Sequence, residues 1–371
     1  MKGIIYNILI IVGIMAMMQD TKAQQQPPAL IEVASFGQNQ PIGVTVAPLT
    51  NRLFVSFSHR EPFLYGLTEI VNGKRVPFPD TEWNKFEPEK AATHFVNVQD
   101  LYADDHNCLW VLDSAPAGSA SVFGKNKGNS SKEGQFKLLK IDLTDNKVKQ
   151  VYRFDDLPKD KSALNDMRID NGKGLAYLSD PGLHAIVVLN LKTGKSRITL
   201  QDDKSTMAKP GLKLHLDGKD VEDENGKPFI SNVNGIALSH DNKYFYYRAI
   251  NQTKLYRIET RYLADATLSS ADLSAKVELV AETGICHGMI ADNKGNIYIS
   301  DSPDHAIQYV TPDKNVHFLV KDERLIWPDS FGIGSDGYLY LSASQVNRLP
   351  KYNNGQDKVH YPFRVYKVKL P

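Results

Sequence analysis

The chain has 371 residues, of which 42% are hydrophobic and 23% charged, values that are typical of a folded protein and exclude a disordered or collagen-like chain. Forty-four Lys and Arg residues nearly balance 43 Asp and Glu residues, so no charge excess indicates nucleic acid or an anionic membrane surface as a partner. Two cysteines are too few for a disulfide-stapled scaffold. The length permits several domains or one large all-β domain.

The first 23 residues have the pattern of a secretory signal peptide. Lys2 precedes the apolar run 3–18, and the small residues Thr21 and Ala23 provide a cleavage site. A membrane anchor is the alternative, but the run is short for a span of about 20 residues. We therefore expect a signal peptide over 1–23 and a single domain over 24–371, secreted or periplasmic and free of the membrane after cleavage.

One pattern recurs six times along the rest of the chain. Each copy has an apolar or Gly-containing strand, a polar turn rich in Asn, Asp and Gly, and a short strand of the type Leu-Tyr-Val-Ser. The first strands are predicted at 42–46, 98–103, 164–169, 233–238, 286–291 and 330–333, and the second strands at 53–56, 108–113, 175–180, 244–247, 296–301 and 338–342. A further hairpin follows several copies, as at 186–200 and 306–320.

Four antiparallel strands per repeat predict a propeller blade, and six repeats predict an all-β, six-bladed β-propeller. We expect the ring to be closed by pairing of N- and C-terminal strands, at 30–36 and 361–370. The stretches 118–134 and 204–227 are predicted to be loop insertions, and 264–275 to form a short helix.

The entry positions of the six first strands form a polar ring that we predict at one mouth of the central channel. In such a fold the first strand of each blade lines the axis, and small ligands bind in its mouths. The ring can hydrogen-bond a small polar ligand, coordinate a cation through oxygen atoms, or hold ordered water. Its members are Gly43, Gln99, Asn165 or Asp166, Asn234 or Gly235, His287, and Asp329.

Two members of this region have alternative roles. His287 could act as a general base or metal ligand, or it could be a hydrogen-bonded channel histidine. Cys286 beside it should point to the opposite face of the strand, which argues against a thiolate–imidazole pair.

Aromatic side chains could wall a pocket for a flat ligand. Trp327 lies two residues before the ring position Asp329 and is a candidate for ligand contact, whereas Trp110, in a second strand, is expected to pack between blades. The other candidates for such a wall are Tyr65, Trp83 and Phe86.

Several of these strands resemble those of the yellow / major royal jelly protein family. The resemblance covers about residues 42–366 and is carried by short motifs in a specific order: Cys108-Leu109-Trp110-Val111-Leu112-Asp113, Ala176-Tyr177-Leu178-Ser179-Asp180, Gly235-Ile236-Ala237-Leu238-Ser239 and Trp327-Pro328-Asp329. It implies a secreted six-bladed propeller. The family is functionally mixed, with members proposed to convert dopachrome and others that bind biogenic amines, so it predicts the fold better than the chemistry.

Family members commonly pair the cysteine at the Cys108 position with one just before the next strand, but residues 132–137 contain no cysteine here. This low cysteine content suggests a bacterial, periplasmic version of the fold. Cys108 and Cys286 belong to blades that face each other across the axis, too far apart for a disulfide. We therefore predict two free, largely buried thiols.

Gluconolactonase and regucalcin propellers are more distantly similar, and they imply a divalent cation at this mouth. Asn165-Asp166 and Asn234-Gly235 resemble two of their ligand elements, so Asn165 and Asn234 are the candidate metal ligands and calcium the possible cofactor. Gly43 and His287, however, stand where that family's Glu and Asp ligands lie. A hard cation prefers carboxylate ligands, so this departure weakens the expectation of a metal.

The sequence thus predicts a monomeric propeller that binds a small polar or aromatic molecule at the channel mouth. The predicted ligand-binding residues are Gln99, Asn165, Asp166, Asn234, His287, Trp327 and Asp329. The alternative is an enzyme, either a divalent-metal-dependent lactonase or a dopachrome-type isomerase, and no residue pattern decides whether catalysis occurs.

Overall fold

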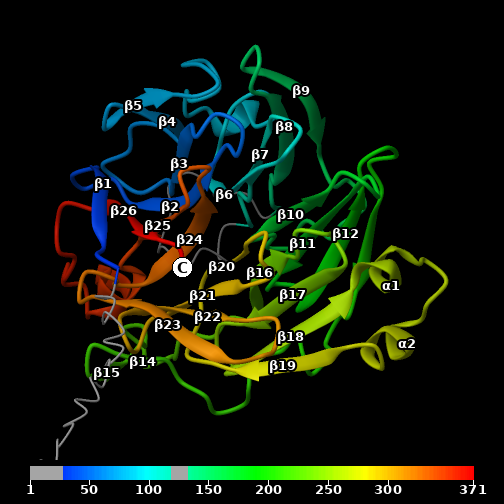
Figure 1. Cartoon of the computed structure of the whole chain (residues 1–371). Helices are drawn as coiled ribbons and strands as arrows, with labels where there is room; N and C mark the ends of the chain where they lie inside the picture. The colour runs from blue at the N-terminus through cyan, green and yellow to red at the C-terminus, as the bar shows by residue number, and fades with distance from the viewer. Residues whose placement is uncertain (1–27, 118–132) are drawn as a thin grey trace, which may run out of the picture.

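A computed structural model of the chain describes residues 28–117 and 133–371. The predicted signal peptide, 1–23, and most of the predicted insertion 118–134 lie outside the described residues. Six four-stranded antiparallel sheets are arranged around a central axis (Figure 1). The predicted all-β, six-bladed propeller is confirmed.

The strands of each blade are given in order from the axis outward. Blade one contains β2 (Pro41–Val46), β3 (Leu53–Phe57), β4 (Leu67–Val71) and β5 (Lys74–Pro77); blade two contains β6 (Val98–Ala103), β7 (Cys108–Asp113), β8 (Lys137–Asp142) and β9 (Lys147–Tyr152). Blade three contains β10 (Met167–Asp170), β11 (Leu175–Asp180), β12 (Ala185–Asn190) and β13 (Ser196–Thr199); blade four contains β16 (Val233–Leu238), β17 (Tyr244–Ala249), β18 (Lys254–Glu259) and β19 (Glu278–Glu282). Blade five contains β20 (Met289–Ala291), β21 (Ile297–Asp301), β22 (Ala306–Val310) and β23 (Val316–Lys321); blade six contains β24 (Pro328–Ile333), β25 (Tyr338–Ala343), β26 (Arg364–Lys369) and β1 (Ile31–Ser35).

Blade six closes the ring, because it combines both ends of the described chain. The N-terminal strand β1 pairs antiparallel with β26, so that Ile31 faces Lys367 and Ser35 faces Arg364. This strand therefore covers the outer edge of the C-terminal hairpin, which would otherwise present unpaired backbone groups. The predicted closure by N- and C-terminal strands is confirmed.

Hydrophobic clusters fill all six interfaces between adjacent blades. The strands are buried on both faces because each sheet is covered by two neighbours, and β7, β11 and β2 are buried at every position. Trp110 illustrates the pattern: it packs with Leu112 from its own blade against Ala176 and Leu178 of blade three, as predicted. Equivalent clusters occupy the other five interfaces.

The serine of the repeated Leu-Tyr-Val-Ser strand has a common role near one mouth of the channel. Its Oγ accepts a hydrogen bond from a backbone N–H at the start of the first strand of the same blade, and in three blades it also donates to a carbonyl of the next blade. The pairs are Ser56 with Gly43 N (2.8 Å) and Gln99 O (3.1 Å), Ser179 with Asp166 N (3.2 Å) and Asn234 O (2.7 Å), and Ser342 with Ser330 N (3.2 Å) and Ile42 O (2.7 Å); Ser300 accepts from His287 N at 2.8 Å. The repeat therefore fastens neighbouring blades to each other where the first strands begin.

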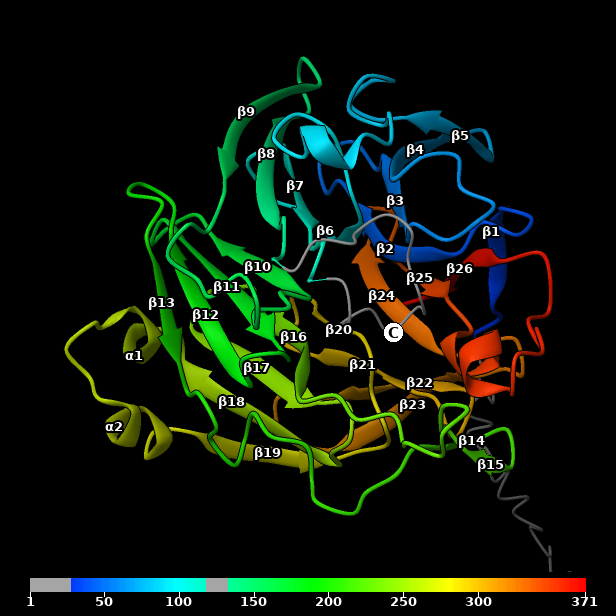
Figure 2. The same ribbon diagram turned by 180° about the vertical axis from the view of Figure 1, so that it is seen from behind.

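Short elements decorate the ring. The predicted helix over 264–275 is two helices, α1 (Thr260–Ala264) and α2 (Ser270–Ser274); α2 begins at a capping box between Ser269 and Asp272. The insertion after blade three contains the hairpin β14 (His215–Leu216) and β15 (Lys219–Asp220), and the short helices η1 (Pro88–Lys90), η2 (Val346–Arg348) and η3 (Pro350–Tyr352) lie in loops. Seen from behind, the hairpin lies beside the loop with η2 and η3 (Figure 2).

Both cysteines are free and buried, as predicted from their positions in opposite blades. Burial raises the pKa of the Cys286 thiol to about 11 and also raises that of Cys108, so both behave as small apolar residues. Among residues 28–117 and 133–371, no helix is long and apolar enough to cross a membrane.

Candidate functional site

The mouth at which the six first strands begin, here called the upper mouth, contains a cavity of about 220 Å³. All seven side chains predicted from the sequence to bind a ligand line it: Gln99, Asn165, Asp166, Asn234, His287, Trp327 and Asp329. They come from blades two, three, four, five and six, so the structure brings together residues that are far apart in the chain. Their role in ligand binding stays a prediction.

Beta-bulges place several of these side chains at the cavity. The pairing of first and second strands shifts register between Val98 and Asp100, between Val233 and Ile236, and between Pro328 and Phe331. Gln99, Asn234 and Asp329 lie inside these shifts. A bulge redirects a side chain that regular pleating would send into a blade interface, and here it gives the site its polar groups.

Three of the polar side chains form a hydrogen-bonded chain along the cavity wall. The Gln99 amide donates to Asn165 Oδ1 at 3.3 Å, and the Asn165 amide donates to Asp166 Oδ1 at 2.9 Å. Asn165 is fixed by its backbone, since its N–H donates to Ser179 O at 2.9 Å. This wall is preorganised before any ligand arrives.

His287 is the most unusual member of the site. It is fully buried, and neither ring nitrogen has a hydrogen-bond partner among the described residues. Burial, and secondarily the charge of Arg248, lower the pKa of this imidazole to about 3, so the ring is neutral at physiological pH. Both roles predicted for His287, a general base or metal ligand and a hydrogen-bonded channel histidine, stay predictions.

Trp327 covers one face of that histidine. The two rings are stacked with their centroids 3.8 Å apart and their planes at 19°. Trp327 has a φ of 52°, a left-handed conformation that is uncommon for a bulky residue. The stack therefore places the apolar face of Trp327 directly against the imidazole of His287 at the cavity.

Two carboxyl groups that line the cavity ionise less readily than an ordinary aspartate. Burial raises the pKa of Asp329 to about 7, with a smaller contribution from the nearby charge of Asp100. Burial and the charge of Asp100 also raise the pKa of Asp166 well above its ordinary value. Near neutral pH these groups can therefore either donate or accept a hydrogen bond.

An ion pair separates this cavity from the rest of the channel. The Arg168 guanidinium donates to Asp100 Oδ2 at 3.2 Å and, across the axis, to Met289 O at 2.8 Å. Both charged side chains are buried. Arg168 thereby links blades two, three and five and blocks the axis below the cavity.

The roof of the cavity comes from residues just after the predicted insertion 204–227 and from the loop after β25, and neither was singled out from the sequence. Phe229, at the end of the insertion after blade three, lines the cavity and meets Trp327 edge to face, with centroids 5.3 Å apart. A separate hydrophobic cluster joins this insertion to the loop after β25, through Leu214, Leu216, Val346 and Leu349. The sequence signal was the apolar residues inside an otherwise charged insertion.

The other aromatic candidates lie elsewhere. Trp110 is in a blade interface, Trp83 packs against Phe95, and Phe86 stacks on His59. None of these three, nor Tyr65, lines the cavity. Of the aromatic candidates named from the sequence, Trp327 therefore lines this cavity and the other four do not, while Phe229 joins it there.

The lactonase-type cation site does not fit these residues. A Cβ atom at Gly43 would lie 2.6 Å from Gln99 O and 2.6 Å from Ser56 Oγ, so no Glu can replace it without moving the next blade. Among residues 28–117 and 133–371, no group of three or more His, Cys, Asp or Glu side chains is placed to hold a metal ion. Asn165 and Asn234 supply neutral oxygens, and the Asp166 and Asp329 carboxyl groups in the same cavity have raised pKa values, so this donor set suits a hard cation poorly.

The fold and the cavity define a class of protein: a six-bladed propeller with a roofed, polar cavity on its axis. The model of the major royal jelly protein family matches residues 96–371, and the chain belongs to that family. No curated protein sequence matches the chain.

Solved structures with the same fold have low sequence identity. A gluconolactonase from Xanthomonas campestris has 12% identity and a TM-score of 0.53, covering 94% of this chain and 96% of its own. A regucalcin from Agrobacterium tumefaciens, described as a calcium-binding protein, has 13% identity and a TM-score of 0.51, covering 92% and 96%. A virginiamycin B lyase from Staphylococcus aureus has 14% identity and a TM-score of 0.50, covering 93% and 100%.

Proposed function

We propose that this chain is an exported binding protein that holds one small polar or aromatic molecule in the upper cavity. The observation that carries the proposal is the His287 ring, which is fully buried at the cavity, stacks on Trp327 and has no hydrogen-bond partner among residues 28–117 and 133–371. A buried polar group without a partner costs about 1–3 kcal/mol. A ligand recovers this cost if its binding opens access to a ring nitrogen and it hydrogen-bonds there. A residue that only filled space at this position could be apolar at no such cost.

The cavity chemistry restricts the ligand. A volume of about 220 Å³ suits a molecule of one or two rings, smaller than a typical drug-sized ligand. The neutral imidazole nitrogens, the Asn165 and Asn234 amides and the weakly ionised carboxyl groups offer both donors and acceptors. Hydroxyl-bearing aromatic compounds, indoles, small sugars and lactones are therefore the compounds to test.

A thermal-shift screen with these four classes, followed by calorimetry on any hit, tests the proposal. A ligand present at 100 times its dissociation constant should stabilise the protein by about 2.7 kcal/mol. Asn165→Ala and Asn234→Ala should weaken binding, and Asn242→Ala, at the opposite mouth, is the matched control. The proposal fails if the ligand binds all three variants as tightly as it binds the unmodified protein.

A second candidate function is catalysis of a proton transfer, as in a dopachrome-type isomerase. Asp329 supports it, because a carboxyl group with a pKa of about 7 can both accept and return a proton near neutral pH. Turnover of a screened ligand, with a rate that depends on a group titrating near pH 7 and lost in Asp329→Asn, would establish it. Metal analysis with and without chelator separates both readings from a lactonase, which requires a stoichiometric divalent ion.

A further inference from the structure

The position of one segment decides how far the upper cavity is covered. This segment, residues 209–231 of the insertion after blade three, is here called the roof segment. Phe229 and Ser231, near its end, line the cavity, and Phe229 meets Trp327 edge to face. A shift of the roof segment therefore changes both the cavity volume and the access to Trp327.

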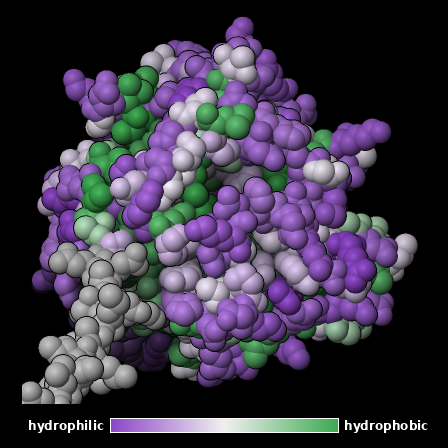
Figure 3. All heavy atoms as spheres, viewed as in Figure 1, coloured by the Kyte–Doolittle hydropathy of each residue, from purple (hydrophilic) through white to green (hydrophobic). Residues whose placement is uncertain are grey.

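The roof segment has little regular structure of its own. Its hairpin, β14 with β15, pairs two residues on each strand. A hairpin this short is not stable alone in water, so the place of the segment depends on its contacts with the ring. Part of that contact is apolar, since Leu214 and Leu216 are buried in a hydrophobic cluster, whereas the outer surface seen in Figure 3 is largely hydrophilic.

The polar part of the contact comes from Asn251, which follows β17 in blade four. Its side chain is fully buried, and its Nδ2 donates to Leu212 O and to Phe229 O, each at 3.0 Å. Its Oδ1 accepts from Ser231 N at 2.8 Å, and its backbone carbonyl accepts from Lys209 N at 2.7 Å. A single residue of blade four thus bonds to both ends of the roof segment.

Both N–H donors of the Asn251 side chain are used in these bonds. Removing the side-chain amide leaves two carbonyl groups and one N–H group of the roof segment without that partner in a buried place. Such groups recover hydrogen bonds when the segment opens to water, so the loss of the amide favours an open segment.

We propose that Asn251 is a positioning residue of the upper site, which holds the roof segment closed over the cavity. Asn251 does not line the cavity itself, so it acts through Phe229 and Ser231, which do. The consequence for ligand binding rests on the proposed function, whereas the hold on the roof segment exists without a ligand.

Asn84, in the loop after blade one, is a matched control. It is also buried; its Oδ1 accepts from Leu67 N at 3.0 Å, and its Nδ2 donates to Phe78 O and Asp80 O, each at 2.9 Å. Its side chain therefore makes the same kinds of hydrogen bond as that of Asn251, but to a different loop. Asn84 does not line the upper cavity.

Amide hydrogen exchange of the full chain, without ligand, is the first test. In Asn251→Ala the amides of Val221 and Phe229 should exchange at least about tenfold faster, because opening of the segment becomes less costly. These amides bond to Leu214 O and Val221 O and not to Asn251, so their exchange reports movement of the whole segment. Asn84→Ala should leave both unchanged. Unchanged exchange in Asn251→Ala, or equal acceleration in Asn84→Ala, overturns the proposal.

Asn251→Asp provides a second variant in case Asn251→Ala does not fold. Aspartate has nearly the same shape and keeps an oxygen for Ser231 N, but it loses at least one of the two donors to the roof segment. It should also accelerate exchange of the segment. Exchange identical to that of the unmodified protein would show that the donors do not hold the segment, and would overturn the proposal.

Access to Trp327 is the second test. In a Trp83→Phe/Trp110→Phe background Trp327 is the remaining tryptophan of the three in the chain. Acrylamide, a small uncharged quencher, should then quench the fluorescence more strongly when Asn251→Ala is added, and equally when Asn84→Ala is added. Unchanged quenching with Asn251→Ala would overturn the claim that this residue keeps the cavity covered.

Catechol and indole are the ligand probes for the third test, by calorimetry. A probe that binds the unmodified protein should bind Asn251→Ala at least about tenfold more weakly, and Asn84→Ala equally well. Equal affinity for Asn251→Ala overturns its role at the site. If neither probe binds the unmodified protein, it is the proposed function that loses support, and the exchange and quenching results still decide whether Asn251 holds the roof segment.

Discussion

Asp329→Asn should make the protein more stable at pH 8 while weakening the upper site. Burial raises the pKa of this carboxyl from 3.8 to about 7. Asparagine has nearly the same shape, cannot ionise, and keeps an oxygen that can accept the hydrogen bond that Trp327 donates to Asp329. The substitution therefore isolates the cost of holding an ionised carboxylate in this cavity.

The sign and size follow from proton linkage. Between about pH 4 and 7 the folded protein retains a proton that the unfolded chain releases, so the free energy of unfolding falls as pH rises through this window and stays low above it. A shift of about three pKa units corresponds to at most about 4 kcal/mol. Asp329 is partly exposed, and contact with solvent reduces the expected gain in the variant to about 2 kcal/mol at pH 8.

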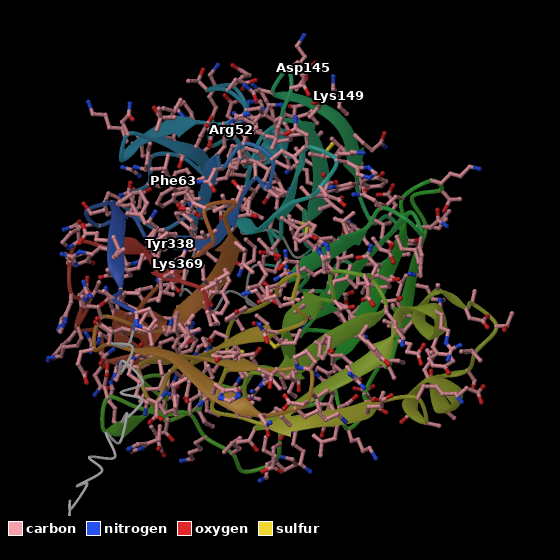
Figure 4. The ribbon with its side chains drawn as sticks, viewed as in Figure 1. Arg52, Phe63, Asp145, Lys149, Tyr338 and Lys369 are labelled. Carbon is pink, nitrogen blue, oxygen red and sulfur yellow. The ribbon has the colours of Figure 1, made fainter. Side chains whose placement is uncertain are left out.

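Urea denaturation at pH 5 and pH 8, with protein and variant compared at each pH, measures this gain. The difference should be larger at pH 8 than at pH 5. Asp145→Asn is the control, because Asp145 is an exposed residue paired with Lys149 (Figure 4), and it should change stability by less than about 0.5 kcal/mol. Equal stabilities of Asp329→Asn and the unmodified protein at pH 8 would refute the linkage argument.

Three further predictions concern the framework around the site. Gly43→Ala should lower the free energy of unfolding by about 2 kcal/mol in urea denaturation, because the new Cβ meets a carbonyl of the next blade. Gly172→Ala is the control: the nearest atom to its Cβ would lie at 3.4 Å, so its stability should not fall. Equal effects of the two substitutions would contradict the clash. Thiol counting should find both Cys108 and Cys286 under denaturing, non-reducing conditions and neither in the native protein, and rapid native-state labelling would contradict their burial. Arg168→Gln should cost about 3–5 kcal/mol, since its carboxylate partner is left buried and unpaired, and a loss below 1 kcal/mol would show that water reaches the pair.

The blades could be predicted from the sequence because their signal is local and repeated. A strand such as β7 is a run of apolar residues next to an Asn- or Asp-rich turn, and its boundaries, Cys108–Asp113, were predicted to the residue. The cavity residues could be predicted for the same reason: equal positions in equal repeats must share one end of the ring. Gln99, Asn234 and Asp329 could be placed at this mouth from their equivalent positions in the aligned repeats alone.

The remaining features depend on contacts that no repeat encodes. The roof is formed by Phe229 against Trp327, a pair almost a hundred residues apart, and the insertion that contains Phe229 has no equivalent in other blades. The first strands of blades three and five begin later than predicted, at Met167 and Met289, although Asn165, Asp166 and Gly288 before them still bond to the backbone of the second strands. The role of the repeated serine as a link between blades could not be predicted from the sequence either, since its hydrogen-bond partners are backbone atoms, which no residue type reveals.

The same mouth combines regular and irregular features, and the contrast between them supports a binding role. The serine links satisfy backbone groups in four blades with distances of 2.7 to 3.2 Å. At the cavity itself, the two ring nitrogens of His287 have no partner in the described part of the chain, Trp327 adopts a left-handed backbone, and Asp329 has a raised pKa. Each of these features costs stability, and sequences lose such features where nothing offsets them. All three residues line the same 220 Å³, so a single bound molecule is the simplest source of the compensation.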